Sequence, residues 1–275
     1  MLKDITLGQY YPAESWIHHL DARVKILSSI AYIVSLFLIK SFYGFILAIA
    51  FLAVVTALST VPLKFMLRGL KPILVLIAFT FVLNLFMTNG DILWQWWILK
   101  ITRQGIYNAA FMALRLIFLI LGSSLLTLTT KPLQLTDGLE RLLSPLAKIG
   151  LPAHELAMMM SIALRFIPTL MEETDKIMKA QMARGADFET GNLAKRAKSL
   201  VPLLVPLFLS AFRIAQDLAM AMEARCYHGG EGRTRMHESK LGKSDALAAL
   251  LVIGYVAAIV ILRPVLTGLP GGSIL

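Results

Sequence analysis

Two arginines stand out because each follows an alanine and precedes a small residue at the end of a long helix-like segment. The first occurs in "AQMARGADFET" as Ala183-Arg184-Gly185, and the second in "AMEARCYHGG" as Ala224-Arg225-Cys226. A guanidinium group offers a planar fork of donors that binds a carboxylate through two parallel hydrogen bonds. The chemistry that these motifs could perform is therefore the docking of a rigid helix end into an acidic groove of a partner.

The segments before the two arginines predict helices at about 153–184 and about 193–225, each roughly 45 Å long. Gly185 suits a left-handed cap just past the first helix. At Cys226 two alternatives stay open: a left-handed cap with some strain, or a helix that continues to a cap at Gly229. An arginine in a last turn also suits the helix dipole, which would explain each arginine singly but not their pairing.

The composition indicates a membrane protein. Of the 275 residues, 57% are hydrophobic and only 16% charged, with a mean hydropathy of +0.71, whereas soluble domains carry about 25% charged residues. We expect an all-α, polytopic fold with about five transmembrane helices and long cytoplasmic coupling helices. The expected spans lie at 24–42, 41–63, 72–90, 104–130 and 246–262.

A few charges lie within these spans. Lys25 and Lys40, near the ends of the first, can snorkel toward the interface. Arg115 lies deep within the span at 104–130. It predicts either a buried coupling or gating charge, or a structural contact between helices.

The distribution of Lys and Arg predicts the orientation. With the N-terminus inside and the C-terminus outside, all but five of the 27 basic residues lie in cytoplasmic segments or at the cytoplasmic end of a helix. The positive-inside rule therefore favours this orientation. This divides the chain into a membrane part at 1–130 with four spans, coupling helices at 131–243 and a last span at 244–275. The apolar run at 152–170 could score as a further span, but a crossing there would place one arginine motif outside. The expected location is the cell membrane, and the net charge of +10 is explained by topology rather than by nucleic acid.

Three apparent motifs fail. "LGKS" at 241–244 has His237 where a phosphate-binding loop needs its first glycine, and no strand is evident before it. "HELAM" has Met158 where a zinc site needs its second histidine, and the pair at 18–19 has no further His or Cys nearby. Cys226, the only cysteine, indicates either a reactive thiol or simply a small residue at a helix end. We expect no enzyme activity, no cofactor and no metal site.

With these features in view, the chain resembles the transmembrane T component of energy-coupling factor (ECF) vitamin importers. The resemblance rests on three segments: "GQYYPAESWIHHLDARVKIL" at 8–27, "ALRFIPTLMEETDKIMKAQMARGADFETGNLAKRAKSLVPLLVPL" at 163–207, and "AMEARCYHGGEGRTRM" at 221–236. It implies that the chain links two cytoplasmic ABC-type ATPases to a membrane substrate-binding S component. It also implies that the two Ala-Arg motifs dock into the ATPases, with Cys226 standing where the family has glycine.

Three other functions remain possible. One is a T component dedicated to a single substrate, such as a transition-metal ion or biotin. Another is a self-sufficient permease, which should show polar residues in several spans where only Arg115 is evident. The last is a polytopic membrane enzyme, which the failed motifs disfavour.

Overall fold

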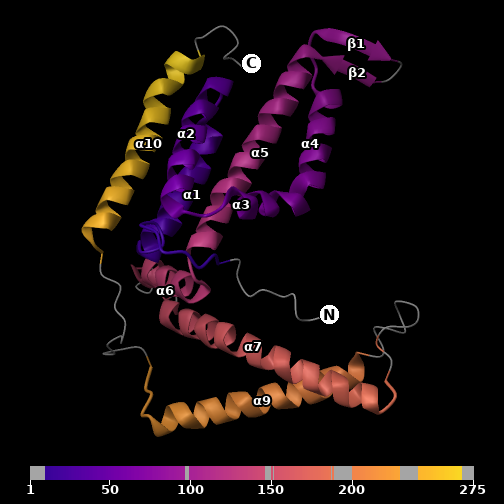
Figure 1. Cartoon of the computed structure of the whole chain (residues 1–275), viewed down its shortest axis with the longest axis vertical. Coiled ribbons are helices and arrows are strands. Elements are labelled where there is room, and N and C mark those ends of the chain that lie inside the picture. Colours follow the sequence, from indigo (N-terminus) through magenta and orange to yellow (C-terminus); the bar gives the residue numbers. More distant parts are fainter. Residues whose placement is uncertain are drawn as a thin grey trace. The chain divides into compact units, whose positions relative to one another are not determined.

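The computed structural model describes residues 10–96, 99–145, 150, 152–186, 188, 200–229 and 241–267. The fold is all-α apart from one hairpin, as the sequence predicts (Figure 1). The chain divides into two compact units. One comprises residues 8–138 and 239–275, and is called the bundle below. The other contains residues 139–238 and is called the arm unit.

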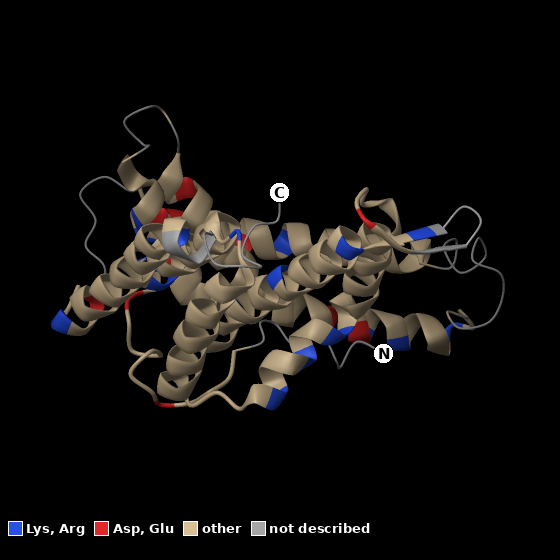
Figure 2. Cartoon of the chain, turned by 90° about the horizontal axis from the view of Figure 1, so that it is seen from above, with Lys and Arg blue, Asp and Glu red and all other residues tan. Residues whose placement is uncertain are grey.

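Apart from the short α3 (Leu63–Leu70), which carries Lys64 and Arg68, the bundle is built from helices that are apolar on nearly every side, as expected of helices surrounded by lipid. Figure 2 shows the same pattern as long uncharged ribbons with scattered charged positions. The helices are α1 (Ala22–Leu38), α2 (Phe42–Ser59), α3 (Leu63–Leu70), α4 (Leu74–Met87), α5 (Arg103–Thr129) and α10 (Lys243–Thr267). A 3₁₀ turn at Lys71–Ile73 separates α3 from α4, because Pro72 cannot continue a regular helix.

Five helical stretches among the described residues are long and apolar enough to cross a membrane: Phe42–Ser59, Leu63–Met87, Arg103–Thr129, Val201–Ala224 and Lys243–Pro264. Four of them cover spans that the sequence predicts. The first predicted span corresponds to α1, which has only 17 residues. The stretch at Val201–Ala224 was expected to be a coupling helix, and its length and composition alone would also allow it to span.

Aromatic side chains hold the bundle together. Tyr255 of α10 stacks on Phe51 of α2 with ring centroids 4.2 Å apart, and Tyr32 of α1 stacks beside both. Gly122 of α5 makes room for this group, since a Cβ there would overlap the ring of Tyr32. The core therefore joins four helices that come from distant parts of the sequence.

A short hairpin that the sequence analysis did not predict connects α4 to α5. Strands β1 (Ile92–Trp96) and β2 (Leu99–Thr102) pair antiparallel, with Trp96 opposite Leu99. Thr102 closes it: its hydroxyl donates to the carbonyl of Thr88 and accepts from the amide of Gly105, which caps α5. The hairpin thus fixes the link between α4 and α5 at the end of the bundle opposite α3 (Figure 1).

The arm unit contains the two long helices that carry the arginine motifs, α7 (Ala153–Ala183) and α9 (Val201–Ala224). The boundary between the two units falls within the shorter α6 (Pro132–Leu143). The predicted first helix agrees with α7 to within one residue at its end. The predicted second helix ends as expected, but its first part, 193–199, lies outside the described residues. The run at 152–170 belongs to α7, which is not among the candidate spans.

Candidate functional site

The first arginine motif ends α7 with a complete Schellman motif. The amide of Gly185 donates to the carbonyl of Met182 at 3.0 Å, and the amide of Ala186 donates to that of Gln181 at 3.0 Å. Gly185 has φ +88°, a left-handed conformation that glycine adopts without steric cost. Arg184 is the C-cap residue, and its side chain is exposed.

The second motif ends α9 in the same way. The amide of Cys226 donates to the carbonyl of Glu223 at 2.9 Å, and the amide of Tyr227 donates to that of Met222 at 3.0 Å. Arg225 is the exposed C-cap residue, and Cys226 has φ +56°. Of the two alternatives for Cys226, the strained left-handed cap is therefore present. The alternative in which the helix continues to a cap at Gly229 is wrong.

Both arginine side chains are available for a partner. Neither guanidinium group makes a hydrogen bond or ion pair with any residue in the described part of the chain. Their five N–H donors therefore face solvent on a backbone fixed by two internal hydrogen bonds. A positively charged fork on a rigid end suits the bidentate binding of a carboxylate.

The two helix ends lie apart within the arm unit. The side chain of Gln181, near the end of α7, donates to the carbonyl of Pro202 at the start of α9, at 3.5 Å. Arg184 therefore lies beside the beginning of α9, whereas Arg225 lies at its far end (Figure 1). Since α9 has 24 residues, the two arginines are separated by roughly 35 Å at 1.5 Å per residue. The site has two separate contact points.

Between these points α9 exposes a large apolar surface. Its exposed side chains include Leu204, Val205, Phe208, Leu209 and Phe212. Met159 and Met160 on α7 and Met220 on α9 are also exposed. Large apolar side chains exposed along one helix indicate a contact with lipid or with another protein.

Arg115 makes structural contacts in the middle of α5. It donates to the carbonyl of Ile39, the C-cap residue of α1, at 2.8 Å. Its guanidinium carbon lies 4.7 Å from the ring centroid of Phe111 and 5.6 Å from that of Phe37. Arg115 thus links α5 to the end of α1, and both roles that the sequence leaves open stay predictions.

A group of polar residues at the start of α1 was not anticipated. Lys25, which the sequence predicts to snorkel toward the interface, is only 7% exposed, and it donates to the carbonyls of His18 and Thr129 at 3.0 Å each. Asp245 of α10 accepts from the amide of Asp21 at 2.8 Å. The contacts with Thr129 and with Asp245 tie together segments more than 100 residues apart, which no local pattern in the sequence reveals.

His18 has a structural role in this group. Its Nδ1 lies 2.6 Å from the hydroxyl of Ser15, and its Nε2 lies 3.1 Å from the carbonyl of Tyr11. Because a carbonyl can only accept, Nε2 carries the proton in the neutral ring. Burial lowers the pKa of His18, which favours this neutral form. Both ring nitrogens are therefore engaged, which leaves neither free to bind a metal.

The apolar helices and the paired arginine ends together define a polytopic α-helical membrane protein with two long helical arms. Residues 13–237 match the family CbiQ, described as cobalt transport protein. A protein of Clostridium kluyveri named energy-coupling factor transporter transmembrane protein EcfT is 59% identical over 96% of this chain and 98% of its own length. Proteins of the same name from Acidaminococcus fermentans and Bacillus subtilis are 55% and 48% identical, over 96% and 92% of this chain and 98% and 96% of their own lengths. The chain belongs to this family of energy-coupling factor transporter transmembrane proteins, and the resemblance found in the sequence is confirmed.

Proposed function

We propose that the chain is the energy-coupling subunit of an ECF-type importer, joining two cytoplasmic ABC-type ATPases to a membrane S component that binds a vitamin or another micronutrient. The observation that carries the proposal is the pair of matching helix ends, each with an exposed arginine. Two equivalent ends suit two equivalent acidic grooves, as on a dimer of related ATPase subunits. The names of the relatives support the same function.

Each arginine would anchor one ATPase subunit. Arg184 and Arg225 are held in the same backbone geometry, so each can present the same fork to the same kind of groove. Their separation of roughly 35 Å along α9 requires two separate grooves rather than one. Closure of the ATPase dimer on ATP binding would then move the two ends relative to each other.

The S component would contact the apolar surface of α9. The exposed leucine, valine and phenylalanine side chains of that helix support this role, and the exposed methionines nearby could adapt to several different S components. Movement of the arm helices would then be passed to the S component and reorient it in the membrane. Because the substrate would be bound by that other subunit, this chain's own residues determine only the coupling.

The proposed orientation is N-terminus inside and C-terminus outside. In the bundle, hydrogen bonds join the starts of α1 and α10 to each other and the end of α5 to the start of α1, so these helix ends share one side. The basic residues Lys64, Arg68, Lys71, Lys131 and Lys243 lie in segments at or next to these ends. The positive-inside rule then places this side in the cytoplasm and the hairpin outside.

The same orientation supports the division of the chain proposed from sequence. The membrane parts would be 1–130 and 244–275, and the coupling part 131–243, which contains most of the arm unit. In this arrangement both arginine ends lie in the cytoplasm, where ATPase subunits can reach them.

We further infer that the chain itself is not catalytic. In the "LGKS" segment, the amide of Gly242 donates to the carboxylate of Asp245 at 2.8 Å, and Lys243 begins α10. A side chain of the protein thus occupies an amide that a phosphate-binding loop would offer to a nucleotide. ATP hydrolysis would belong to the partner subunits.

The decisive experiment is co-purification of the ATPase subunits with Arg184→Ala, Arg225→Ala and the double variant, together with vitamin uptake in cells. Each truncation leaves a partner carboxylate unpaired and should cost about 2–5 kcal/mol of local interaction. One loss should weaken the complex, and both should largely abolish it because two-point attachment is lost.

Arg165→Ala on α7 and Arg213→Ala on α9 are matched controls, since both arginines are exposed on the same helices away from the ends. They should retain the ATPases. If the double variant assembles and transports like the parent, the arginines serve only as helix caps and the proposed docking role is wrong.

A further inference from the structure

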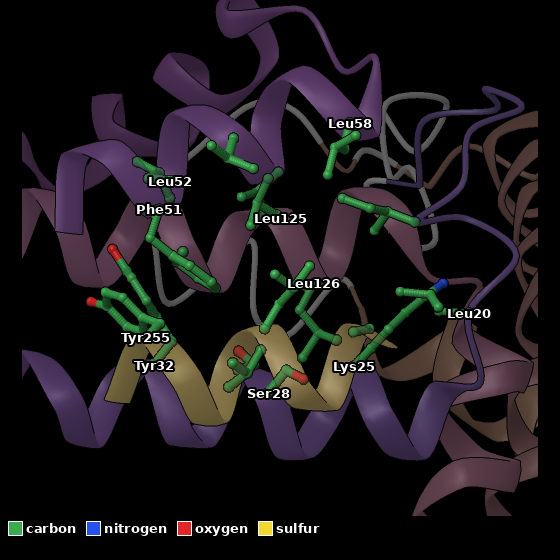
Figure 3. Close-up of a pocket in the computed structure, with 18 of the residues that line it drawn as sticks. Leu20, Lys25, Ser28, Tyr32, Phe51, Leu52, Leu58, Leu125, Leu126 and Tyr255 are labelled. Carbon is green, nitrogen blue, oxygen red and sulfur yellow. The ribbon is translucent and has the colours of Figure 1, made fainter. Parts of the chain in front are cut away.

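A pocket of about 400 Å³ lies inside the bundle, between α1, α2, α5 and α10 (Figure 3). One end is closed by Tyr32, Phe51 and Tyr255. Figure 3 shows Leu20 and Lys25 at the opposite end. Small residues leave the space open, among them Ser28, Ser29, Ala50, Gly122 and Ala248.

The pocket opens toward the lipid-facing surface between α2 and α10. Its lining includes side chains that are exposed on the outside of the bundle, such as Val54 of α2, 54% exposed, and Leu251 of α10, 47% exposed. Because α2 and α10 are both candidate spans, this opening would face the bilayer once both helices cross it. Nearly all of its lining is apolar, so water has few partners there, whereas a hydrocarbon chain would regain the dispersion contacts that an empty space forfeits.

Lys25 brings a positive charge to one end of the pocket, where Asp245 and Asp21 attract it without forming an ion pair. The residue is only 7% exposed, and two of its three ammonium donors are used by the carbonyls of His18 and Thr129. It makes no ion pair with any residue in the ranges that the structure describes. A buried ammonium with no anion in direct contact is costly, so a negative group that accepts its third donor would stabilise it.

The two carboxylates that attract Lys25 are held by other donors. Both carboxylate oxygens of Asp21 accept from Arg23. The carboxylate of Asp245 accepts from the amides of Asp21 and Gly242, at 2.8 Å each. Neither is placed to accept the remaining donor of Lys25, so this donor is left for a group from outside the bundle.

We propose that the pocket binds a phospholipid with an acidic headgroup. One acyl chain lies between α2 and α10, and the phosphate accepts the third N–H of Lys25. Lys25 lies in the first turn of α1, so the headgroup sits at the membrane interface while the chain extends toward Tyr32 and Tyr255. The lipid would be a bound component of the bundle, separate from the arginine ends and the coupling role.

Trp16 lines the same pocket and provides a probe. In a full-length chain with Trp94, Trp96 and Trp97 replaced by phenylalanine, Trp16 is the only tryptophan left. The protein is reconstituted in phosphatidylcholine containing a small fraction of lipid with brominated acyl chains. The brominated lipid is either phosphatidylglycerol or phosphatidylcholine, and quenching of Trp16 is measured for each.

Brominated phosphatidylglycerol should quench Trp16 at about a fivefold lower mole fraction than brominated phosphatidylcholine, as expected for one lysine acting on an acidic headgroup. Excess inorganic phosphate should leave this preference unchanged. Equal quenching of Trp16 by the two lipids would overturn the proposal. Absence of quenching by either lipid would also overturn it, because it would mean that protein closes or fills the pocket. Loss of the preference in phosphate would mean that Lys25 binds free phosphate instead.

Two pairs of variants sharpen the test. Lys25→Met should remove the headgroup preference, whereas Lys40→Met, at the exposed opposite end of α1, should keep it. Ala50→Phe should reduce quenching by both lipids, while Ala53→Phe, on α2 but outside the pocket lining, should not. The opposite result in either pair would count against the proposal. If Lys25→Met does not fold, the comparison of headgroups in the parent protein decides alone.

Discussion

Gly185 and Cys226 occupy the same position in two copies of one helix-ending motif. Each is the first left-handed residue after its arginine, with φ of +88° and +56°, and each donates its amide to the carbonyl three residues earlier. Glycine adopts this conformation freely, whereas a residue with a Cβ loses roughly 1–2 kcal/mol. The two ends are therefore alike in geometry and unlike in stability.

Cys226→Gly should stabilise the end of α9. Relief of the left-handed strain should slow hydrogen exchange at the amides of residue 226 and Tyr227 by about fivefold, corresponding to ~1 kcal/mol. Gly185→Ala should have the opposite effect at the end of α7, since a Cβ there is strained although nothing lies within 4 Å of it. Unchanged exchange in both variants would show that the left-handed strain is negligible at these ends.

Arg184→Lys and Arg225→Lys should each retain the ATPases better than the alanine variants but less well than the parent. An ammonium keeps the charge and loses the planar fork. Dissociation rates of the purified complex would measure the difference. Full recovery with lysine would mean that charge alone is recognised, and Arg165→Lys and Arg213→Lys should behave like the parent.

Arg115→Met should destabilise the bundle without changing coupling. It removes the hydrogen bond to the carbonyl of Ile39 and the contacts with Phe37 and Phe111, at a cost of about 1–3 kcal/mol. Thermal unfolding in detergent would measure the loss. Transport per folded complex should stay at the parent level; a variant that is stable but does not transport would instead assign Arg115 to coupling or gating.

Cys226 allows the orientation to be tested without engineering. It is the only cysteine in the chain. In intact cells that express the chain without its partners, an impermeant maleimide should not label Cys226. In inverted membrane vesicles the same reagent should label it. In a Cys226→Ser background, Lys100→Cys in β2 should show the reverse pattern. Labelling of Cys226 from outside would contradict the proposed topology.

The sequence predicts the elements that depend on local pattern. Long apolar runs predict α2, α4, α5 and α10, with Arg115 the one charge inside the run at 104–130. The Ala-Arg-small endings predict where α7 and α9 stop to within one residue. Hydropathy and helix capping both depend on residues within a few turns of one another. The local sequence is therefore sufficient to predict these helices and their ends.

What the sequence does not reveal depends on partners far along the chain. Lys25 is buried because the carbonyl of Thr129, 104 positions away, accepts from it. Arg115 is positioned by the end of α1, 76 positions away. The hairpin at 92–102 was missed because its strands are only five and four residues long and lie beside two much longer apolar helices.

The contact between Gln181 and Pro202 makes the two arginine ends mechanically unequal. It lies close to Arg184, whereas Arg225 lies a full helix length beyond it. A force applied at Arg225 would exert a torque on α9 about this contact, while the same force at Arg184 would act almost at the pivot. Two equivalent motor subunits pulling on this chain would therefore produce an asymmetric motion, turning one arm more than the other.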